Sequence, residues 1–183
     1  MVRRFKGLVA GAAVLAACPA YAVDGMSFEY GDSDSSQSDV QLYRVGVQWK
    51  WSQKWLPIGN WHLGGYWDAS LGYWDNQSAG ATHSSIFDIG LTPVFRFQQT
   101  TPSAISPYAE IGLGFHFLSH TSVSPQRQFG TSFQFGDHLG VGLRFGERGQ
   151  YDLGYRFQHL SNAGIKQPND GINFHQVRLQ YHF

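Results

Sequence analysis

The sequence predicts an all-β fold, an eight-stranded antiparallel transmembrane β-barrel. Its apolar residues alternate with a period of two, they recur in eight runs, and aromatic side chains gather near the ends of those runs. Aromatic residues make up 16% of the 183 residues and charged residues only 14%, which is not the composition of a disordered chain. The 13 basic residues balance the 13 acidic ones, which argues against a nucleic-acid partner.

Residues 1–22 are expected to be a secretory signal peptide, and residues 23–183 the barrel domain. A basic start precedes an apolar stretch at 8–17 that is too short to span a bilayer, and Ala20-Tyr21-Ala22 has the small-x-small pattern of a cleavage site. Cys18 ends a Leu-Ala-Ala-Cys run that also fits a lipoprotein cleavage box, so lipidation of Cys18 stays open as an alternative. Because Cys18 is the only cysteine, a disulfide framework and a cysteine-cluster zinc site are excluded.

Each predicted strand is justified by its own alternation, because successive side chains of a strand point to opposite faces. The runs are around 8 to 10 residues long on average, the length that a tilted strand needs to cross hydrocarbon. The last run ends in register on an aromatic residue, as in the terminal strand of bacterial outer-membrane barrels. In order, the runs and their residues on the apolar face are 26–30 (Met, Phe, Tyr), 43–51 (Tyr, Val, Val, Trp, Trp), 61–73 (Trp, Leu, Gly, Trp, Ala, Leu, Tyr), 87–97 (Phe, Ile, Leu, Phe, Phe), 107–117 (Pro, Ala, Ile, Leu, Phe, Phe), 135–145 (Phe, Leu, Val, Leu, Phe), 151–157 (Tyr, Leu, Tyr, Phe) and 177–183 (Val, Leu, Tyr, Phe).

The connections between these runs fit hairpins that cross a membrane. With the N-terminus in the periplasm, alternate connections fall outside the cell, and the periplasmic turns are shorter on average. We assign the connections near 31–38, 75–84, 118–132 and 162–172 to the cell exterior, and those near 52–60, 98–104 and 146–149 to the periplasm.

The opposite face of the runs is ionic. In a soluble sandwich this face would meet water, and that alternative stays open. The run lengths, the aromatic strand ends and the even strand count favour a closed barrel, since an open sheet edge cannot be hydrogen-bonded in lipid. An interior of this size is filled by side chains, so we expect no pore, and we interpret its charges as structural pairs. The ionic face carries Glu29, Arg44, Gln48, Lys50, His62, Asp68, Asp88, Arg96, Glu110, His116, His138, Arg144, Asp152, Arg156 and Arg178.

Polar residues interrupt the apolar face near the outer ends of the last two runs. Continuing the face beyond Phe157 leads to His159 and Ser161, and continuing it back from Val177 leads to His175 and Asn173. In an antiparallel hairpin, pairing Phe157 with His175 also places His159 against Asn173. The sequence therefore predicts that His159, Ser161 and Asn173 are neighbours on the face that meets the bilayer.

This constellation favours nucleophilic catalysis. A serine hydroxyl is a poor nucleophile until a base takes its proton, and the base needs a third group to fix its tautomer and orientation. We assign Ser161 as the nucleophile, His159 as the base and Asn173 as the orienting group. Asn162 and the backbone amides around Gly164 could hold the oxyanion. An exposed loop histidine beside a turn serine is the alternative reading of the same residues.

The run from His159 to Ile172, HLSNAGIKQPNDGI, resembles the signature hairpin of the lipid A 3-O-deacylases (the PagL family), eight-stranded outer-membrane enzymes. Weaker similarities, GYWDA at 65–69, PYAE at 107–110 and GVGL at 140–143, extend through most of the chain. The resemblance implies a serine esterase that removes the ester-linked 3-hydroxyacyl chain at position 3 of lipid A. It implies His159 as base, Ser161 as nucleophile and Asn162 near the oxyanion.

One position departs from this resemblance. The family pattern has a glutamate directly after the Gly-Ile that ends the hairpin, and this chain has Asn173 there. A neutral amide can accept a hydrogen bond from the histidine, but it cannot stabilise the imidazolium by charge. The use of an asparagine in this role also resembles outer-membrane phospholipase A, which has a His-x-Ser motif with a later asparagine. The barrel of that enzyme is larger than this chain can form.

The expected substrate is lipopolysaccharide, taken sideways from the outer leaflet of the bacterial outer membrane, in which the chain is a multi-pass protein. Lys166 could meet a phosphate or sugar of the headgroup, although a solvated loop lysine is the simpler reading. No metal-ligand cluster lies on one face, so no cofactor is expected. An outer-membrane phospholipase or lipid esterase and a noncatalytic structural barrel remain alternatives, and the oligomeric state, a homodimer included, stays open.

Overall fold

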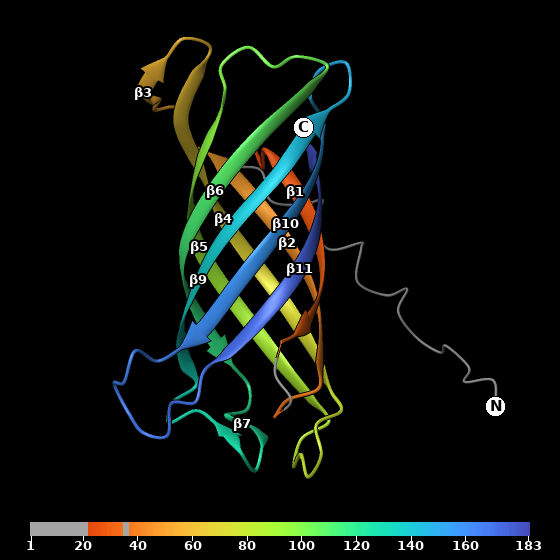
Figure 1. Ribbon diagram of the computed structural model, residues 1–183, viewed down its shortest axis with the longest axis vertical. Helices are drawn as coiled ribbons and strands as arrows, with labels where there is room; N and C mark the ends of the chain where they lie inside the picture. Colours follow the sequence, from red (N-terminus) through yellow and green to blue (C-terminus); the bar gives the residue numbers. More distant parts are fainter. Residues whose placement is uncertain (1–21, 35–36) are drawn as a thin grey trace, which may run out of the picture.

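The computed structural model describes residues 22–34 and 37–183, and it shows a closed antiparallel β-barrel of eight strands (Figure 1). The predicted fold class is therefore confirmed. Neighbouring barrel strands are hydrogen-bonded in chain order, and β1 pairs with β11 to close the ring. The barrel strands are β1 (Gly25–Ser33), β2 (Val40–Lys50), β4 (Trp61–Asn76), β5 (Ser85–Gln99), β6 (Ile105–Leu118), β9 (Phe133–Phe145), β10 (Tyr151–Ser161) and β11 (Ile172–His182).

The predicted signal peptide, apart from Ala22, and Cys18 with its lipoprotein alternative lie outside the described residues. Within the described residues, no helix has the length and apolar character needed to cross a membrane.

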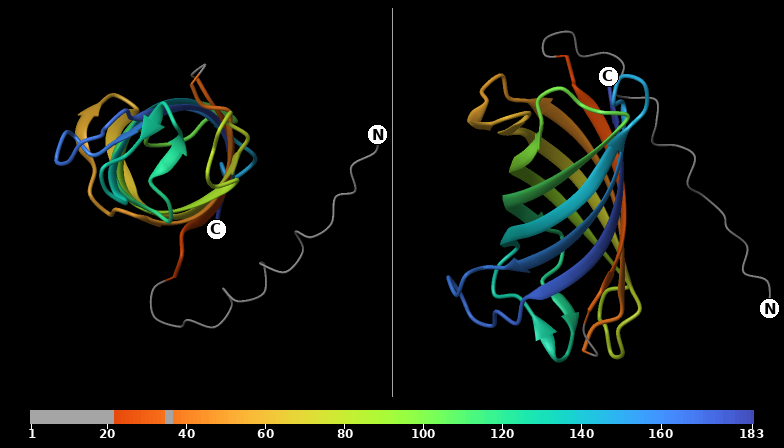
Figure 2. Two further views of the ribbon diagram at one scale, coloured as in Figure 1. Left: turned by 90° about the horizontal axis from the view of Figure 1, so that it is seen from below. Right: turned by 45° about the horizontal axis from the view of Figure 1, so that its top comes forward.

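The connections alternate between the two ends of the barrel as predicted. Residues 34–39, 77–84, 119–132 and 162–171 join strands at one end, called the outer end below, and residues 51–60, 100–104 and 146–150 join them at the other. Two of these connections contain short strands that the sequence did not predict. They are β3 (Trp55–Ile58), which pairs with the start of β4, and the hairpin of β7 (Ser122–Ser124) with β8 (Arg127–Gln128). The view along the barrel in Figure 2 shows that the β7–β8 hairpin covers the outer mouth.

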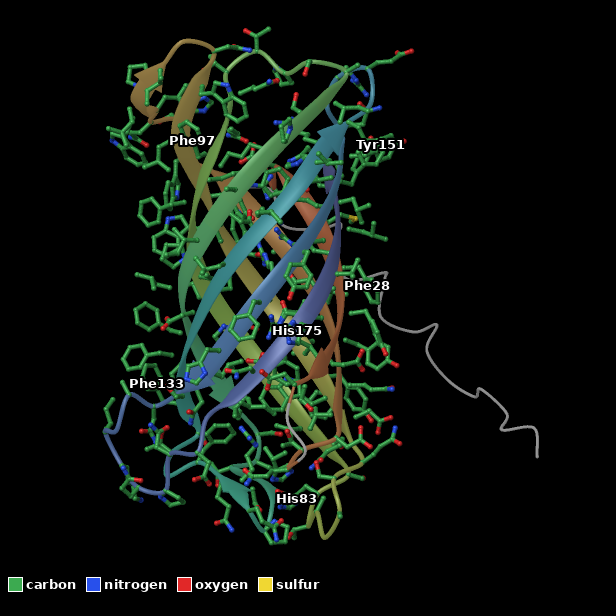
Figure 3. The ribbon with its side chains drawn as sticks, in the orientation of Figure 1. Phe28, His83, Phe97, Phe133, Tyr151 and His175 are labelled. Atoms are coloured by element: carbon green, nitrogen blue, oxygen red, sulfur yellow. The ribbon has the colours of Figure 1, made fainter. Side chains whose placement is uncertain are left out.

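The outward face is apolar, as the alternation predicts. Phe28, Phe97, Phe133 and Tyr151 project from the outside of the barrel wall (Figure 3). Leu113 and Val45 are more than half exposed, which suits a surface covered by hydrocarbon and not by water.

Aromatic rings cluster on this face at the end opposite the outer end. The Trp51 ring lies edge-on to Phe95 with the centroids 5.0 Å apart. It also lies over Gly65, where an added Cβ would come within 2.3 Å of the ring. Glycine at position 65 therefore lets the indole pack directly onto the barrel wall.

The barrel interior holds a network of buried ion pairs. Arg156 contacts Glu29 at 2.8 Å and Glu110 at 2.7 Å, and Arg96 contacts Glu110 at 2.7 Å and Asp152 at 2.6 Å. The pairs compensate the cost of removing these charges from water. The interior is therefore filled by paired side chains, as expected for eight strands.

Two members of the predicted ionic face are not buried in the barrel interior as the others are. Lys50 is exposed and Arg144 is only half-buried, because both stand close to strand ends at the open inner mouth. Both line a cavity there together with His62 and Arg148.

An apolar cluster closes the outer end of the interior, and we call it the apolar plug. The sequence did not predict it, because the inward face was read as ionic along its whole length. In the plug, the Trp74 and Phe174 rings meet edge-on with centroids 4.9 Å apart. The β7–β8 connection adds two of its members from above the mouth. The plug consists of Val40, Leu42, Trp74, Ile86, Leu118, Val123, Phe129, Leu160, Ile172 and Phe174.

Candidate active site at the outer end of β10 and β11

The register of the β10–β11 hairpin is the one predicted from the sequence. Phe157 pairs with His175, and His159 pairs with Asn173. On the other side of β10, His159 pairs with Asp137 of β9. Because paired residues point to the same face, all of these side chains belong to the outward face of the barrel near its outer end.

His159 and Asn173 are joined by a side-chain hydrogen bond. The distance from His159 Nδ1 to Asn173 Oδ1 is 2.6 Å, and both side chains are half-buried. An amide oxygen only accepts, so the proton must lie on Nδ1. The other ring nitrogen, Nε2, is then unprotonated in the neutral ring and able to take a proton.

A third group, absent from the sequence prediction, completes this arrangement. The amide nitrogen Nδ2 of Asn173 donates to Asp34 Oδ2 at 3.0 Å. Asp34 follows directly after β1 and reaches Asn173 because β1 and β11 are neighbours in the closed ring. An aspartate in a polar loop so distant in the sequence carried no local signal of this contact.

Ser161 is the last residue of β10 and is half-buried. It lies two residues from His159, so both side chains share one face at a Cα separation of roughly 6.6 Å. In the described part of the chain no hydrogen bond joins the Ser161 hydroxyl to the His159 ring. Catalytic hydrogen bonds are often long before substrate binds and tighten in the complex.

Asn162 organises the turn that follows Ser161. Its side chain is fully buried, with Oδ1 accepting from the Gly164 amide at 3.0 Å and Nδ2 donating to the Lys166 carbonyl at 2.8 Å. Its backbone N–H donates to Asn169 Oδ1 at 2.8 Å. One of the two Nδ2 hydrogens remains after the bond to Lys166. The Gly164 N–H is engaged with Asn162 in this structure.

Gly171 sits against the His159 ring. Its φ is 64°, a conformation that favours glycine, and an added Cβ would lie 2.9 Å from His159 Cε1. Arg127 donates from Nη1 to the Gly171 carbonyl, and the backbone N–H of Gln128 donates to Asp170 Oδ2 at 2.7 Å. The β7–β8 hairpin therefore supports the loop that leads into Asn173.

Further polar groups lie on the outward face around this pair. The Tyr155 hydroxyl is 2.5 Å from His175 Nδ1, and Asp137 is exposed. His175 is visible on the near side of the barrel wall in Figure 3. Lys166 is also exposed, on the connection between β10 and β11. Across residues 22–34 and 37–183, no three His, Cys, Asp or Glu side chains are grouped as metal ligands would be.

Comparisons with known proteins agree on one family. A family model described as "Lipid A 3-O-deacylase (PagL)" matches residues 41–182, a range that includes all five predicted site residues. "Lipid A deacylase PagL" from Pseudomonas aeruginosa is 40% identical over 135 residues, which is 74% of each chain. The protein of the same name from Bordetella bronchiseptica is 31% identical over 167 residues, 87% of this chain and 83% of the relative.

A solved structure supports the same relationship. The crystal structure of the outer membrane enzyme PagL superimposes with a TM-score of 0.74 at 32% sequence identity. The superposition covers 87% of this chain and 99% of that chain. The similarity therefore extends over almost the whole described barrel.

Proposed function

The chain belongs to the lipid A 3-O-deacylase (PagL) family, and we propose that it hydrolyses the ester at position 3 of lipid A as a serine esterase. The chain is a multi-pass outer-membrane barrel with lipid A as its substrate. The serine mechanism and the residue roles are the proposed part. The observation that carries them is the hydrogen bond between His159 and Asn173, on the outward face beside Ser161.

In the proposed mechanism, His159 Nε2 takes the proton of the Ser161 hydroxyl as Ser161 Oγ attacks the acyl carbonyl carbon. The resulting intermediate collapses by breaking the bond to the sugar oxygen, which leaves with the proton from His159. The 3-hydroxyacyl chain is then held as an ester on Ser161. Water, deprotonated by His159, attacks that ester; the bond to Ser161 Oγ breaks, His159 returns the proton to Oγ, and the fatty acid is released. Asn173 keeps the proton on Nδ1 throughout.

We propose that Asn162 and Gly164 stabilise the oxyanion. The second Nδ2 hydrogen of Asn162 is the proposed donor, and because the side chain is fully buried it would have to become accessible when substrate binds. Donors fixed in this way act on charge that develops in the transition state. The Gly164 N–H would have to leave Asn162 Oδ1 before it could reach a substrate oxygen.

The position of the site determines how a lipid would reach it. The side chains of His159, Ser161 and Asn173 lie on the lipid-facing side, at the outer end of the barrel. Lipopolysaccharide in the outer leaflet would therefore enter sideways and present its acyl ester to Ser161. Lys166 is exposed on the connection that follows Ser161, and we propose that it meets a headgroup phosphate.

The test is mass spectrometry of lipid A from a host that expresses the protein, its Ser161→Ala variant or Ser132→Ala as a control. Ser132 is an exposed serine in a neighbouring outer connection. We expect the loss of one 3-hydroxyacyl chain with the parent and with Ser132→Ala but not with Ser161→Ala, although all three form heat-modifiable barrels. Deacylation by a folded Ser161→Ala protein would disprove the role of Ser161.

A further inference from the structure

We propose that Asp34 is a positioning residue for the esterase site: its carboxylate holds the Asn173 amide in the one orientation that lets His159 act as a base. This inference rests on the proposed roles of His159 and Ser161 and adds a residue from the opposite end of the chain. Asp34 also lies outside residues 41–182, the range that the family model matches.

Two contacts join Asp34 to Asn173. The Asn173 amide donates to the Asp34 carboxylate at 3.0 Å, and the Asp34 backbone N–H donates to the Asn173 carbonyl at 3.2 Å. The second contact follows the last β1–β11 pair, Ser33 with Phe174, and so extends the ladder by one step. The carboxylate is therefore placed by the sheet and not by a chance loop conformation.

Hydrogen bonds of the Ser33 side chain hold the backbone next to Asp34. The Ser33 hydroxyl donates to the Ser38 carbonyl at 3.0 Å and accepts from the Val40 backbone N–H at 3.1 Å. These bonds tie the end of β1 to the start of β2 across the short connection. Asp34 therefore follows a residue, Ser33, whose side chain is held by two hydrogen bonds, and its own carboxylate contacts the Asn173 amide directly.

The chemistry of the amide explains why such a partner matters. An amide side chain has a donor end and an acceptor end, and it can present either one to a histidine. An ionised carboxylate only accepts, so Asp34 attracts the NH₂ end and turns the oxygen towards His159 Nδ1. The reversed amide would donate to Nδ1, place the ring proton on Nε2 and remove the base. A carboxylate at position 173 would need no such partner, because both of its oxygens accept.

Asp34 also adds a negative charge one residue beyond the amide. This charge favours the imidazolium that forms during the reaction, but its effect is small because Asp34 is exposed to solvent. Among the described residues, charged groups close to His159 include Asp137, its partner on β9, and Arg127, which binds the carbonyl of the adjacent Gly171. Neither group changes in the variants proposed below.

The first experiment compares purified full-length barrels in detergent acting on lipopolysaccharide. We expect Asp34→Asn to lower kcat about fivefold with KM unchanged and to move the acid limb of the pH profile to lower pH. Asp34→Lys, which offers only donors, should reverse the amide and lower kcat roughly 100-fold. The control is Asp32→Asn, which removes the same charge from β1, where Asp32 binds the Tyr30 hydroxyl and not Asn173. Equal kinetics for Asp34→Asn and Asp32→Asn would overturn the proposal.

The second experiment uses the Asn173→Glu background. There Asp34 would face a second carboxylate, so Asp34→Asn should raise kcat, by about twofold, where in the parent it lowers kcat. The same loss in both backgrounds would show that Asp34 acts on loop structure and not through the amide.

A readout without turnover separates this proposal from the proposed function. ¹⁵N NMR of the histidine rings, with His159 assigned by the His159→Gln variant, reports which ring nitrogen carries the proton. We expect the Nδ1–H form in the parent and an increased Nε2–H fraction in Asp34→Lys. If the parent protein shows these tautomers but has no activity, the proposed esterase function is refuted, whereas the effect of Asp34 on the Asn173 amide is supported. An active parent whose tautomer is unchanged by Asp34→Lys would refute the role of Asp34.

Discussion

Leu160 pairs with Ile172 in the β10–β11 hairpin, and both side chains are fully buried in the apolar plug. The next pair along the same ladder is His159 with Asn173, whose side chains point outward. The plug therefore supports the backbone of β10 and β11 from the inside, one residue away from the proposed catalytic groups.

Truncation of this inner support should reduce both stability and activity. Leu160→Ala removes a fully buried side chain, and we expect it to lower the free energy of unfolding by about 2–5 kcal/mol. Because Leu160 lies between His159 and Ser161, kcat should fall as well. Urea unfolding in detergent micelles checks the first effect and lipid A mass spectrometry the second. The control is Leu113→Ala on the outward face, where 55% of the side chain is exposed, and a loss equal to that of Leu160→Ala would contradict the role of the plug.

Exchange of the Asn173 amide, the proposed orienting group, for a carboxylate should preserve the reaction or accelerate it. In Asn173→Glu the side chain can still accept from His159 Nδ1, and its charge stabilises the imidazolium directly. We expect activity equal to or above that of the parent, and the acid limb of the pH profile should move to higher pH. Complete inactivity of a folded Asn173→Glu barrel would show that residue 173 is not the orienting group.

Gly171 should tolerate no side chain because of the ring beside it. Gly171→Ala places a Cβ about 2.9 Å from His159 Cε1, so the ring must move and kcat should fall roughly 10-fold or more. Gly59→Ala is the matched control, since Gly59 has a similar φ of 58° but no atom within 4 Å of an added Cβ. Each substitution should destabilise the barrel by about 1 kcal/mol through its backbone conformation, and only Gly171→Ala should affect turnover. Parallel kinetics for the two variants would contradict the contact with His159.

The proposed oxyanion role of the Asn162 side-chain amide can be tested by comparing substitutions at Asn162 and at Asn169, which binds the Asn162 backbone. If Asn162 is an oxyanion donor, we expect Asn162→Ala to lower kcat by about 10²- to 10³-fold, the loss that follows removal of one oxyanion-hole donor from a serine protease. Asn169→Ala removes the bond to the Asn162 backbone but leaves the Asn162 amide in place, so it should cost far less. Single-turnover deacylation assays measure both. If the two variants lose activity to the same extent, the loss comes from the altered loop conformation, and the Asn162 side-chain amide is not an oxyanion donor.

The sequence predicts the barrel and the register of its last hairpin for a local physical reason. Alternation along each strand reports which face meets lipid, and the polar replacements at His159 and Asn173 fix the pairing of β10 with β11. The short strands β3 and β7–β8 have too few residues for an alternating pattern. The plug escaped prediction because only the tertiary structure shows that the inward face changes from ionic to apolar near the outer end.

The contact of Asp34 with Asn173 could not be predicted in the same way. The two residues are 139 positions apart, and their alignment depends on how the first strand meets the last when the ring closes. That offset is a property of the whole barrel, set jointly by strand number and tilt. No local signal in the polar segment around Asp34 reports it.

The buried ion pairs have a consequence for how the ring assembles. Glu29 on β1 is bound by Arg44 of the adjacent β2, but its closer partners, Arg156 and Arg178, arrive on the last two strands. A partly built sheet would leave the Glu29 carboxylate poorly compensated in a water-poor space, at a cost of several kcal/mol. A late intermediate in which β1 and β11 are not yet paired is therefore raised in free energy for two reasons. Its edge strands have unpaired backbone groups, and the Glu29 carboxylate lacks Arg156 and Arg178. Closure should consequently be a cooperative, all-or-none event, completed by the hairpin that carries both the candidate active site and the two arginines that pair with Glu29.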